Sequence, residues 1–224
     1  MDWSAARVSF WLAGATVVLL LPFALWLGRA LAIGHWRGRA LVEAALMLPL
    51  LLPPTVIGFY FLVVFGGASP IGAWLREHFD VSLVFTFEGL LAASLIVNLP
   101  FMVQPIQRAF AAIPESLREA AWVSGLSRWQ TLVKIELPLA WPGIVGGAAL
   151  TFAHTLGEFG VVLMVGGSIA GETRTLSIAI YDRVQAFDNA AAGTMSLALV
   201  ALSLVALSIA LATGQRGRHA LQER

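Results

Sequence analysis

Long apolar windows separated by charged residues dominate this chain of 224 residues. A helix that crosses a lipid bilayer needs roughly 20 mostly apolar residues. Five windows are suitable, and they predict transmembrane helices at about 8–31, 43–66, 85–107, 138–164 and 189–213. The window around the second helix, residues 44–75, is longer than one span requires. The shorter apolar stretch 159–171 is interrupted by Gly166 and Gly167, and we expect it to finish the fourth helix.

The composition supports a membrane protein rather than a soluble one. Hydrophobic residues make up 58% of the chain and charged residues 12%, and the mean hydropathy is +0.82. A soluble domain has about 25% charged residues, so a soluble fold of this sequence could not cover its surface. Cysteine is absent, which excludes disulfides and thiolate metal sites, and the net charge of +1 gives no broad field for nucleic acid. The sequence therefore predicts an all-α integral membrane protein whose residues 1–224 form a single transmembrane domain.

Basic residues are distributed unevenly over the loops between the predicted helices. An odd number of spans places the two termini on opposite sides of the membrane. If the N-terminus lies outside, ten of the 14 basic residues face the cytoplasm, namely Arg29, Arg37, Arg39, Arg108, Arg118, Arg128, Lys134, Arg216, Arg218 and Arg224. Because cytoplasmic loops carry an excess of Lys and Arg, we expect the N-terminus outside and the C-terminus in the cytoplasm.

The first apolar window also has features of a secretory signal peptide. Arg7 precedes it, and Ala30-Leu31-Ala32 resembles a cleavage site. The apolar run is longer than that of a signal peptide, however, and arginines continue beyond it. A retained transmembrane helix is the favoured interpretation, and since seven residues precede the window, we expect no additional span before it.

The longest predicted cytoplasmic connection, residues 108–138, has helical signals of its own. Pro114 can occupy the first position of a helix that Gly125 ends. One face of this helix is expected to carry Leu117, Ala120, Ala121 and Ser124. Elsewhere on its surface we expect the charged residues Glu115, Arg118 and Glu119 together with Trp122. Ser127 can cap a second short helix, which Pro138 is expected to stop. This helix–glycine–helix segment suits docking into a groove of another protein, or else it lies among the lipid headgroups.

Within this segment a spaced motif, E-A-A-x3-G-x9-I-x-L-P, is formed by Glu119-Ala120-Ala121, Gly125, Ile135, Leu137 and Pro138. The segment thereby resembles the EAA loop of permease subunits of ABC importers. The resemblance implies a type I ABC importer permease fold, a homodimer in a bacterial inner membrane, two ATP-binding cassette subunits and an external substrate-binding protein. It also implies that coupling to the ATPase depends on Glu119, Ala120, Ala121, Gly125, Ile135, Leu137 and Pro138.

The chain lacks the motif that ATP hydrolysis would require. A phosphate-binding loop has the pattern G-x-x-x-x-G-K-[ST], and the one lysine of this chain, Lys134, follows Val133 instead of glycine. The four histidines lie in different segments, which argues against a metal site or an intramembrane active site. We therefore expect a subunit without catalytic residues, metal or bound cofactor, with ATP and Mg²⁺ used by the partner ATPase.

Three further stretches resemble the molybdate permeases among the ABC importers. They are residues 48–58 (LPLLLPPTVIG), 156–160 (LGEFG) and 171–175 (GETRT). Sulfate, thiosulfate and tungstate permeases share much of this pattern, so these oxyanions stay open as alternatives to molybdate. A secondary transporter is a more remote alternative, because it would need a coupling-ion site and usually an internal repeat, and neither is apparent.

Polar residues inside the predicted membrane helices are candidates for a translocation path, because such groups face a bundle interior or a water-filled route. Thr151, His154 and Glu158 recur on one face of the fourth helix. Asn98 and Thr55 lie close to prolines, which free backbone carbonyls that membrane proteins tolerate against protein or a cavity. Alternatively, His154 and Glu158 pair at i, i+4 and simply hold the helix against a neighbour.

Two outer arginines and two glycines complete the candidate residues. Arg174 and Arg183 can receive the external binding protein, or they are ordinary solvated loop charges. Gly143 and Gly147 form a G-x-x-x-G pair that favours close helix packing. Because five helices cannot readily enclose a central path, we expect two copies of the chain to form it.

Overall fold

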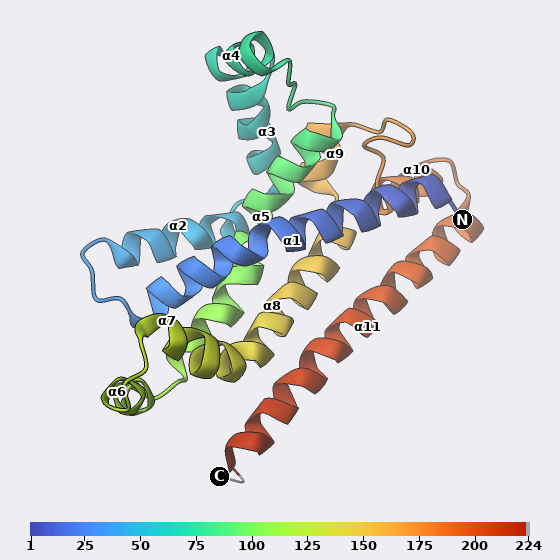
Figure 1. Ribbon diagram of the computed structural model, residues 1–224. Coiled ribbons are helices and arrows are strands. Elements are labelled where there is room, and N and C mark those ends of the chain that lie inside the picture. Colours follow the sequence, from blue (N-terminus) through green and yellow to red (C-terminus); the bar gives the residue numbers. More distant parts are fainter. Residues whose placement is uncertain (223–224) are drawn as a thin grey trace.

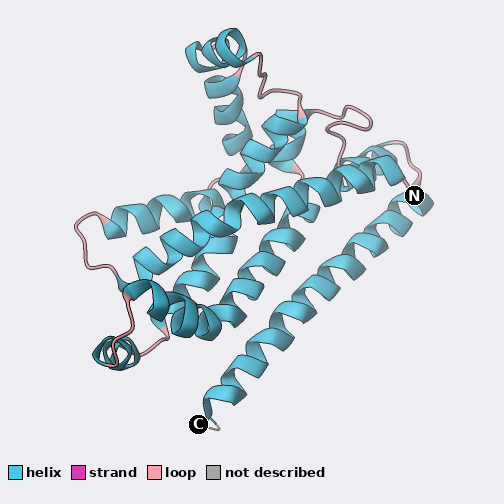
Figure 2. Cartoon of the chain, in the orientation of Figure 1, coloured by secondary structure: helices cyan, strands magenta, loops and turns pink. Residues whose placement is uncertain are grey.

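The computed structural model describes residues 1–222, with the side chains of the last helix described through Ile209. Helices joined by loops make up this part of the chain (Figure 1, Figure 2). In chain order they are α1 (Trp3–Ile33), α2 (Arg39–Leu51), α3 (Pro54–Phe65), α4 (Pro70–Phe79), α5 (Phe87–Ala111), α6 (Glu115–Val123), α7 (Arg128–Thr131), the π-helical turn η1 (Leu132–Glu136), α8 (Leu137–Gly157), α9 (Gly160–Gly166), α10 (Leu176–Gln185) and α11 (Asn189–Gln222). Arg224, one of the ten basic residues used to orient the chain, lies outside the described residues.

A bundle of α1, α5 and α8 forms the centre of the fold, and α11 packs along α8 (Figure 1). The core between α1, α5 and α8 is mainly aliphatic. Its buried side chains include Leu20, Ala24, Leu27, Leu31, Met102, Val103, Ile106, Phe110, Ala140 and Ile144. A Cβ at Gly143 would lie 2.4 Å from Ala109 Cβ, and one at Gly147 would lie 2.9 Å from the Met102 carbonyl oxygen. The prediction that this glycine pair permits close helix packing is therefore confirmed.

Within the described part of the chain, four helices are long and apolar enough to cross a membrane, and they correspond to the first, third, fourth and fifth predicted spans. The first begins at Trp3 rather than at residue 8, because Asp2 caps it by accepting a hydrogen bond from the Ala5 amide at 3.0 Å. The last, over Asn189–Ile209, buries 17% of its apolar window within this chain. So much exposed apolar surface suits a lipid environment or a second protein.

The second predicted span is not one helix. α2 and α3 meet at an angle of 110° across Leu52 and Pro53, so the expectation of a single helix over 43–66 is wrong. Two consecutive prolines explain the break, because Pro53 disfavours helical geometry at the residue before it and Pro54 suits the start of a new helix. The excess length of the apolar window is explained by α4, which Ser69 caps through the Gly72 amide at 2.8 Å.

The fourth predicted span ends earlier than expected. α8 stops at Gly157, and the stretch that was expected to finish it forms the separate helix α9. The chain leaves the helix at Glu158, whose backbone is extended and whose carboxylate accepts a hydrogen bond from the Val161 amide at 3.1 Å. That bond satisfies an amide in the first turn of α9, which packs against α3 and α5.

The same span begins earlier than expected. Pro138 does not stop the preceding helix, and α7, η1 and α8 form one continuous helix over Arg128–Gly157. In η1 the Leu137 amide donates to the Leu132 carbonyl, which is the wider hydrogen-bond spacing of a π-helix. This wider turn lies where the Pro138 ring would otherwise meet the carbonyl one turn before it, which explains why the helix continues.

The two termini lie at opposite ends of the bundle (Figure 1). α10 packs beside the first turn of α1 and the start of α11, where Ala5, Leu176, Ala179 and Met195 form a small buried cluster. α6 and α7 lie at the other end, beside the last turns of α1. The segment predicted to be cytoplasmic is thus remote from the N-terminus, and the orientation in the membrane stays a prediction.

Candidate coupling surface and translocation path

α6 forms a projection at the end of the molecule remote from the N-terminus (Figure 1). Pro114 precedes it in an extended conformation, and Glu115 occupies its first turn, where a negative charge suits the helix N-terminus. Gly125 follows the helix with φ +86°, so the prediction that this glycine ends the helix is confirmed. Ser127 then caps α7 as predicted, in a capping box in which its hydroxyl accepts from the Gln130 amide and the Gln130 side chain accepts from the Ser127 amide.

One face of α6 is open to its surroundings. Ser116, Glu119, Ala120 and Val123 follow the i, i+3, i+4, i+7 spacing of a single helix face, and all four are exposed. We call these four residues the docking face. Val123 is 89% exposed, although its side chain is apolar. Small side chains beside one carboxylate allow a partner protein to approach this face of the helix closely.

The orientation of α6 differs from the one that its periodicity predicts. Of the predicted small and apolar face, Ala121 is buried, but Leu117, Ala120 and Ser124 are exposed. Arg118, which we expected on the surface, is buried. α6 is therefore rotated so that Arg118 and Ala121 face the bundle.

Arg118 is buried because three acceptors surround its guanidinium. Nε donates to Glu136 Oε1 at 2.9 Å, and the two Nη atoms donate to the carbonyl oxygens of Phe110 at 2.8 Å and Ile113 at 3.2 Å. Glu136 is itself 0% exposed, and Arg29 also donates to it, from Nε at 2.5 Å and from Nη2 at 3.2 Å. We call Arg29, Arg118 and Glu136 the buried ion cluster.

The buried ion cluster was not predicted from the sequence. One signal was present, since Glu136 is an acidic residue between two apolar residues of the motif. Its partner Arg29 is 107 residues distant in sequence, however, and such a contact leaves no periodic trace. The other predicted coupling residues at this junction, Ile135 and Leu137, are half-buried, and Pro138 is exposed in the first turn of α8.

The structure brings three of the five candidate path residues together. His154 Nδ1 lies 3.2 Å from Asn98 Oδ1, and His154 Nε2 lies 3.7 Å from Glu158 Oε2. The Asn98 amide donates to the Ser94 carbonyl and hydroxyl oxygens, and the Ser94 hydroxyl accepts from Thr16 of α1 at 2.9 Å. A polar network thus connects α1, α5 and α8 through the middle of the bundle.

His154 and Glu158 line a cavity of about 250 Å³. The remaining walls come from the α2–α3 break, from α5 and from α9, and the lining residues are Pro49, Leu50, Leu52, Pro54, Ile57, Val97, Phe101 and Val161. The His154 ring stacks on Phe101, with the ring centroids 3.9 Å apart. The i, i+4 pair of His154 and Glu158 is therefore present, as a structural role predicts. A cavity beside this pair is also present, as a translocation path predicts.

The other two candidates lie apart from this network. Thr55 is exposed near the start of α3. Thr151 is fully buried in α8, and among the described atoms its hydroxyl has no hydrogen-bond partner. Neither lines the cavity that holds His154 and Glu158.

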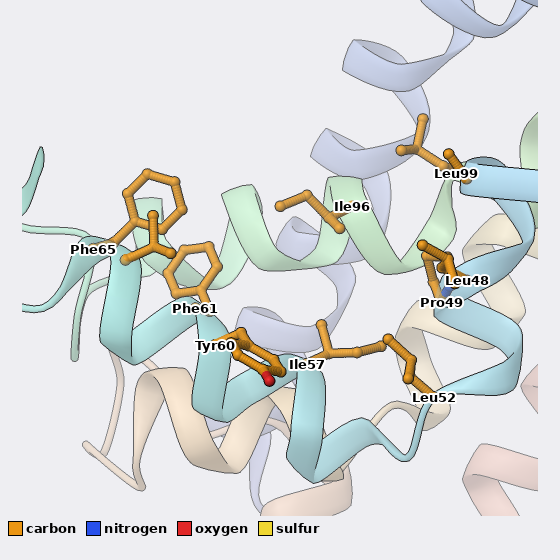
Figure 3. A pocket seen from close by; sticks show the side chains of 11 residues that line it. Leu48, Pro49, Leu52, Ile57, Tyr60, Phe61, Phe65, Ile96 and Leu99 are labelled. Atoms are coloured by element: carbon orange, nitrogen blue, oxygen red, sulfur yellow. The ribbon is translucent and has the colours of Figure 1, made fainter. Parts of the chain in front are cut away.

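A second cavity, of about 340 Å³, lies between α2, α3 and α5 (Figure 3). Its labelled walls are aliphatic and aromatic side chains, among them Leu48, Ile57, Phe61 and Ile96, and Tyr60 contributes the one hydroxyl group. An oxyanion needs hydrogen-bond donors or positive charge. This apolar cavity therefore does not suit an oxyanion.

The two outer arginines have different environments. Arg174 is 22% exposed in its side chain and lies between two carboxylates, 3.7 Å from Asp2 Oδ2 and 3.3 Å from Asp182 Oδ2. A hydrogen bond from the Ala5 amide, assisted by Ser4 and Arg174, holds the pKa of Asp2 below its usual value. Arg174 therefore ties the start of α1 to α10. Arg183 is 47% exposed and pairs with Asp188, so it is the more accessible of the two for an external partner.

Comparison with known proteins gives consistent results. The model of the family described as "Binding-protein-dependent transport system inner membrane component" matches residues 10–218. The chain is 44% identical over 210 residues to the molybdenum transport system permease protein ModB of Azotobacter vinelandii, covering 92% of this chain and 91% of that protein. It is 35% identical over 173 residues to the sulfate transport system permease protein CysT of Escherichia coli, covering 77% of this chain and 62% of that protein.

The fold also has solved relatives. A bacterial ABC transporter involved in the import of the acidic polysaccharide alginate matches with a TM-score of 0.71 and 19% sequence identity, over 96% of this chain and 78% of that one. The type I permease fold that the motif implied is therefore confirmed.

Proposed function

The chain belongs to the family of binding-protein-dependent transport system inner membrane components, and on this basis we propose that it is the permease subunit of an ATP-driven molybdate importer. The observation that carries this proposal is the 44% identity to a molybdenum permease over nearly the whole length of both chains. The similarity to a sulfate permease covers less of both proteins. Molybdate is therefore the first substrate to test, with sulfate, thiosulfate and tungstate as the alternatives.

The proposed importer divides its work between subunits. This chain lacks a phosphate-binding loop, so ATP and Mg²⁺ act in two separate ATP-binding cassette subunits, each seated on the docking face of one permease copy. Glu119 offers a carboxylate to a basic residue of the ATPase, and Ala120 permits close approach. An external binding protein captures the anion and delivers it at the opposite end of the bundle, where Arg183 is accessible.

Two copies of this chain form the proposed translocation path. The polar network through Asn98 and His154 reaches a cavity that one copy encloses incompletely. No arginine or lysine lies in the middle of a predicted span, which favours a route that an anion passes through over a site that retains it. Nucleotide binding by the ATPase shifts the population between inward-open and outward-open packings, because the partners bind the two packings unequally.

The substrate is tested by transport in a reconstituted system. Proteoliposomes that contain the permease, its ATPase and its binding protein are expected to take up radiolabelled molybdate when ATP is available to the ATPase. A tenfold excess of unlabelled molybdate should suppress this uptake more strongly than the same excess of sulfate or thiosulfate. Stronger suppression by sulfate would replace molybdate with sulfate as the substrate, and tungstate would be identified in the same way.

The orientation is tested by labelling single cysteines, since the natural chain contains none. We expect Trp122→Cys, on exposed α6, to react with a membrane-impermeant maleimide in inverted vesicles and to stay unlabelled in intact cells. Ser4→Cys, near the N-terminus, should show the opposite pattern in cells whose outer membrane is permeabilised. Labelling of residue 122 in intact cells would contradict the proposed topology.

A further inference from the structure

The buried ion cluster joins elements that are far apart in the sequence. Arg118 belongs to α6, Glu136 to the π-helical turn before α8, and Arg29 to the last turns of α1. Arg118 also donates to the carbonyl oxygens of Phe110, in the last turn of α5, and of Ile113, just after this helix. One guanidinium–carboxylate cluster therefore connects the predicted coupling helix to all three helices of the central bundle.

We propose that Glu136 is the positioning residue that transmits displacement of α6 into α1 and α8. This inference rests on the proposed function, because it assigns the internal route by which an ATPase bound at the docking face would move the transmembrane helices. Glu136 does not touch the ATPase or the substrate in this role. It acts through Arg118 on one side and Arg29 on the other.

The backbone on both sides of α6 makes such a link necessary. Pro114 lies in an extended conformation before the helix, and Gly125 lies in a left-handed conformation after it. Helix hydrogen bonding therefore does not continue from α5 into α6 or from α6 into α7. The inward side chains must carry the connection, and among them Arg118 makes three hydrogen bonds to other elements.

The charge balance of the cluster makes Glu136 its essential member. Two guanidinium groups share a single carboxylate that is fully buried. The carbonyl oxygens at the C-terminal end of α5 supply the additional negative potential that a second buried cation needs. Without the carboxylate the two arginines would repel each other, and the contact between α6 and α1 would be lost.

The position of Glu136 in the helix also suits this role. It is the last residue of the π-helical turn within the continuous helix Arg128–Gly157. Single π-helical turns inside α-helices occur frequently at functional sites. A force applied to Glu136 therefore acts at the junction between the short helix α7 and the membrane helix α8.

The test compares Glu136→Gln with the matched control Glu43→Gln in the fully assembled importer. Glu43 also bonds an arginine and an amide, Arg39 at 3.0 Å and Gln107 at 2.7 Å, but it lies outside the cluster. With binding protein and ATP present, we expect Glu136→Gln to lower the molybdate transported per ATP hydrolysed by about fivefold. Glu43→Gln should leave this ratio unchanged, and ATPase subunits should co-purify normally with both variants.

A second variant decides the case if Glu136→Gln fails to assemble. Arg118→Lys keeps the charge, but a lysine lacks the planar fork that reaches three acceptors on different elements. We expect it to assemble and to show the same fall in transport per ATP. An unchanged ratio in an assembled Glu136→Gln or Arg118→Lys complex would overturn the proposal.

Spin labels measure the link directly. Spin labels are attached to cysteines introduced at Ser116 in α6 and at Trp26 in α1. The labelled chain is diluted with unlabelled chains, so that the measured distance joins the two helices of one copy. Nucleotide binding should leave this distance unchanged in the parent chain and change it in Glu136→Gln, because α6 then moves without α1. The same nucleotide-dependent change in both proteins would also overturn the proposal. If the parent complex does not transport molybdate, it is the proposed function that fails, and the distances still report whether the cluster links the helices.

Discussion

Replacing Ala120 with tryptophan will abolish both molybdate uptake and co-purification of the ATPase subunit. Ala120 lies on the docking face between Glu119 and the exposed Val123, where the proposed partner must approach the helix closely. A residue at the centre of a protein interface contributes about 2–4 kcal/mol, which corresponds to roughly 30- to 1000-fold weaker association. The association is measured by pull-down of the ATPase with the tagged permease, and transport is measured by uptake into proteoliposomes.

The control for this variant is Ala40→Trp. Ala40 is also an exposed alanine in a helix, but it lies in α2, outside the docking face. It should leave co-purification intact, and both variants should unfold at the temperature of the parent chain because neither side chain enters the core. Normal ATPase binding by Ala120→Trp would show that α6 is not the docking site, and the lipid headgroup interpretation of this helix would then be preferred.

Replacing Gly143 with valine will destabilise the bundle itself. A Cβ at this position would lie 2.4 Å from Ala109 Cβ and 2.7 Å from the Pro105 carbonyl oxygen, so α5 and α8 must move apart. Overpacking of this kind costs up to about 3 kcal/mol, which lowers the midpoint of unfolding by roughly 6–12 °C for a chain of this size. The measurement is thermal unfolding of the purified chain in detergent.

Gly146 provides a matched control in the same helix. A Cβ at Gly146 would have nothing within 4 Å among the described atoms, and its backbone is helical. Gly146→Val should therefore unfold near the parent temperature, or slightly above it, since valine has the higher helix propensity. Equal loss of stability in both variants would show that valine destabilises α8 wherever it is placed, and that the α5–α8 contact does not explain the effect.

The transmembrane helices were largely predictable because bilayer thickness sets the length of an apolar window. Their ends were less predictable, since local chemistry decides them. Asp2 extends α1 towards the N-terminus, and the extended backbone at Glu158 separates α9 from α8. The 110° bend at Pro53 lies inside an apolar window, and an average of hydropathy cannot detect a change of direction.

Local features of the candidate site could be predicted from the sequence, but contacts between distant residues could not. The helix–glycine–helix segment could be located from the sequence, because its glycine and capping residues act locally, whereas its coupling role is a prediction that rests on the resemblance. The burial of Arg118 could not, because a charged side chain is assigned to the surface unless its distant acceptors are known. Asn98 and His154 were singled out separately as polar residues in apolar helices, but their contact depends on how α5 packs against α8.

The uninterrupted helix Arg128–Gly157 limits how this protein can be recombined with its relatives. Its thirty residues form a helix of about 45 Å, with Trp129 near the loop that is proposed to meet the ATPase and His154 in the cavity wall. The π-helical turn fixes the angular phase between these two ends, since each residue added or removed there would rotate everything beyond it by about 100°. A chimera whose junction inside this helix adds or removes a residue would turn the cavity residues away from the proposed path, so a junction there must keep the number of residues between the loop and the cavity.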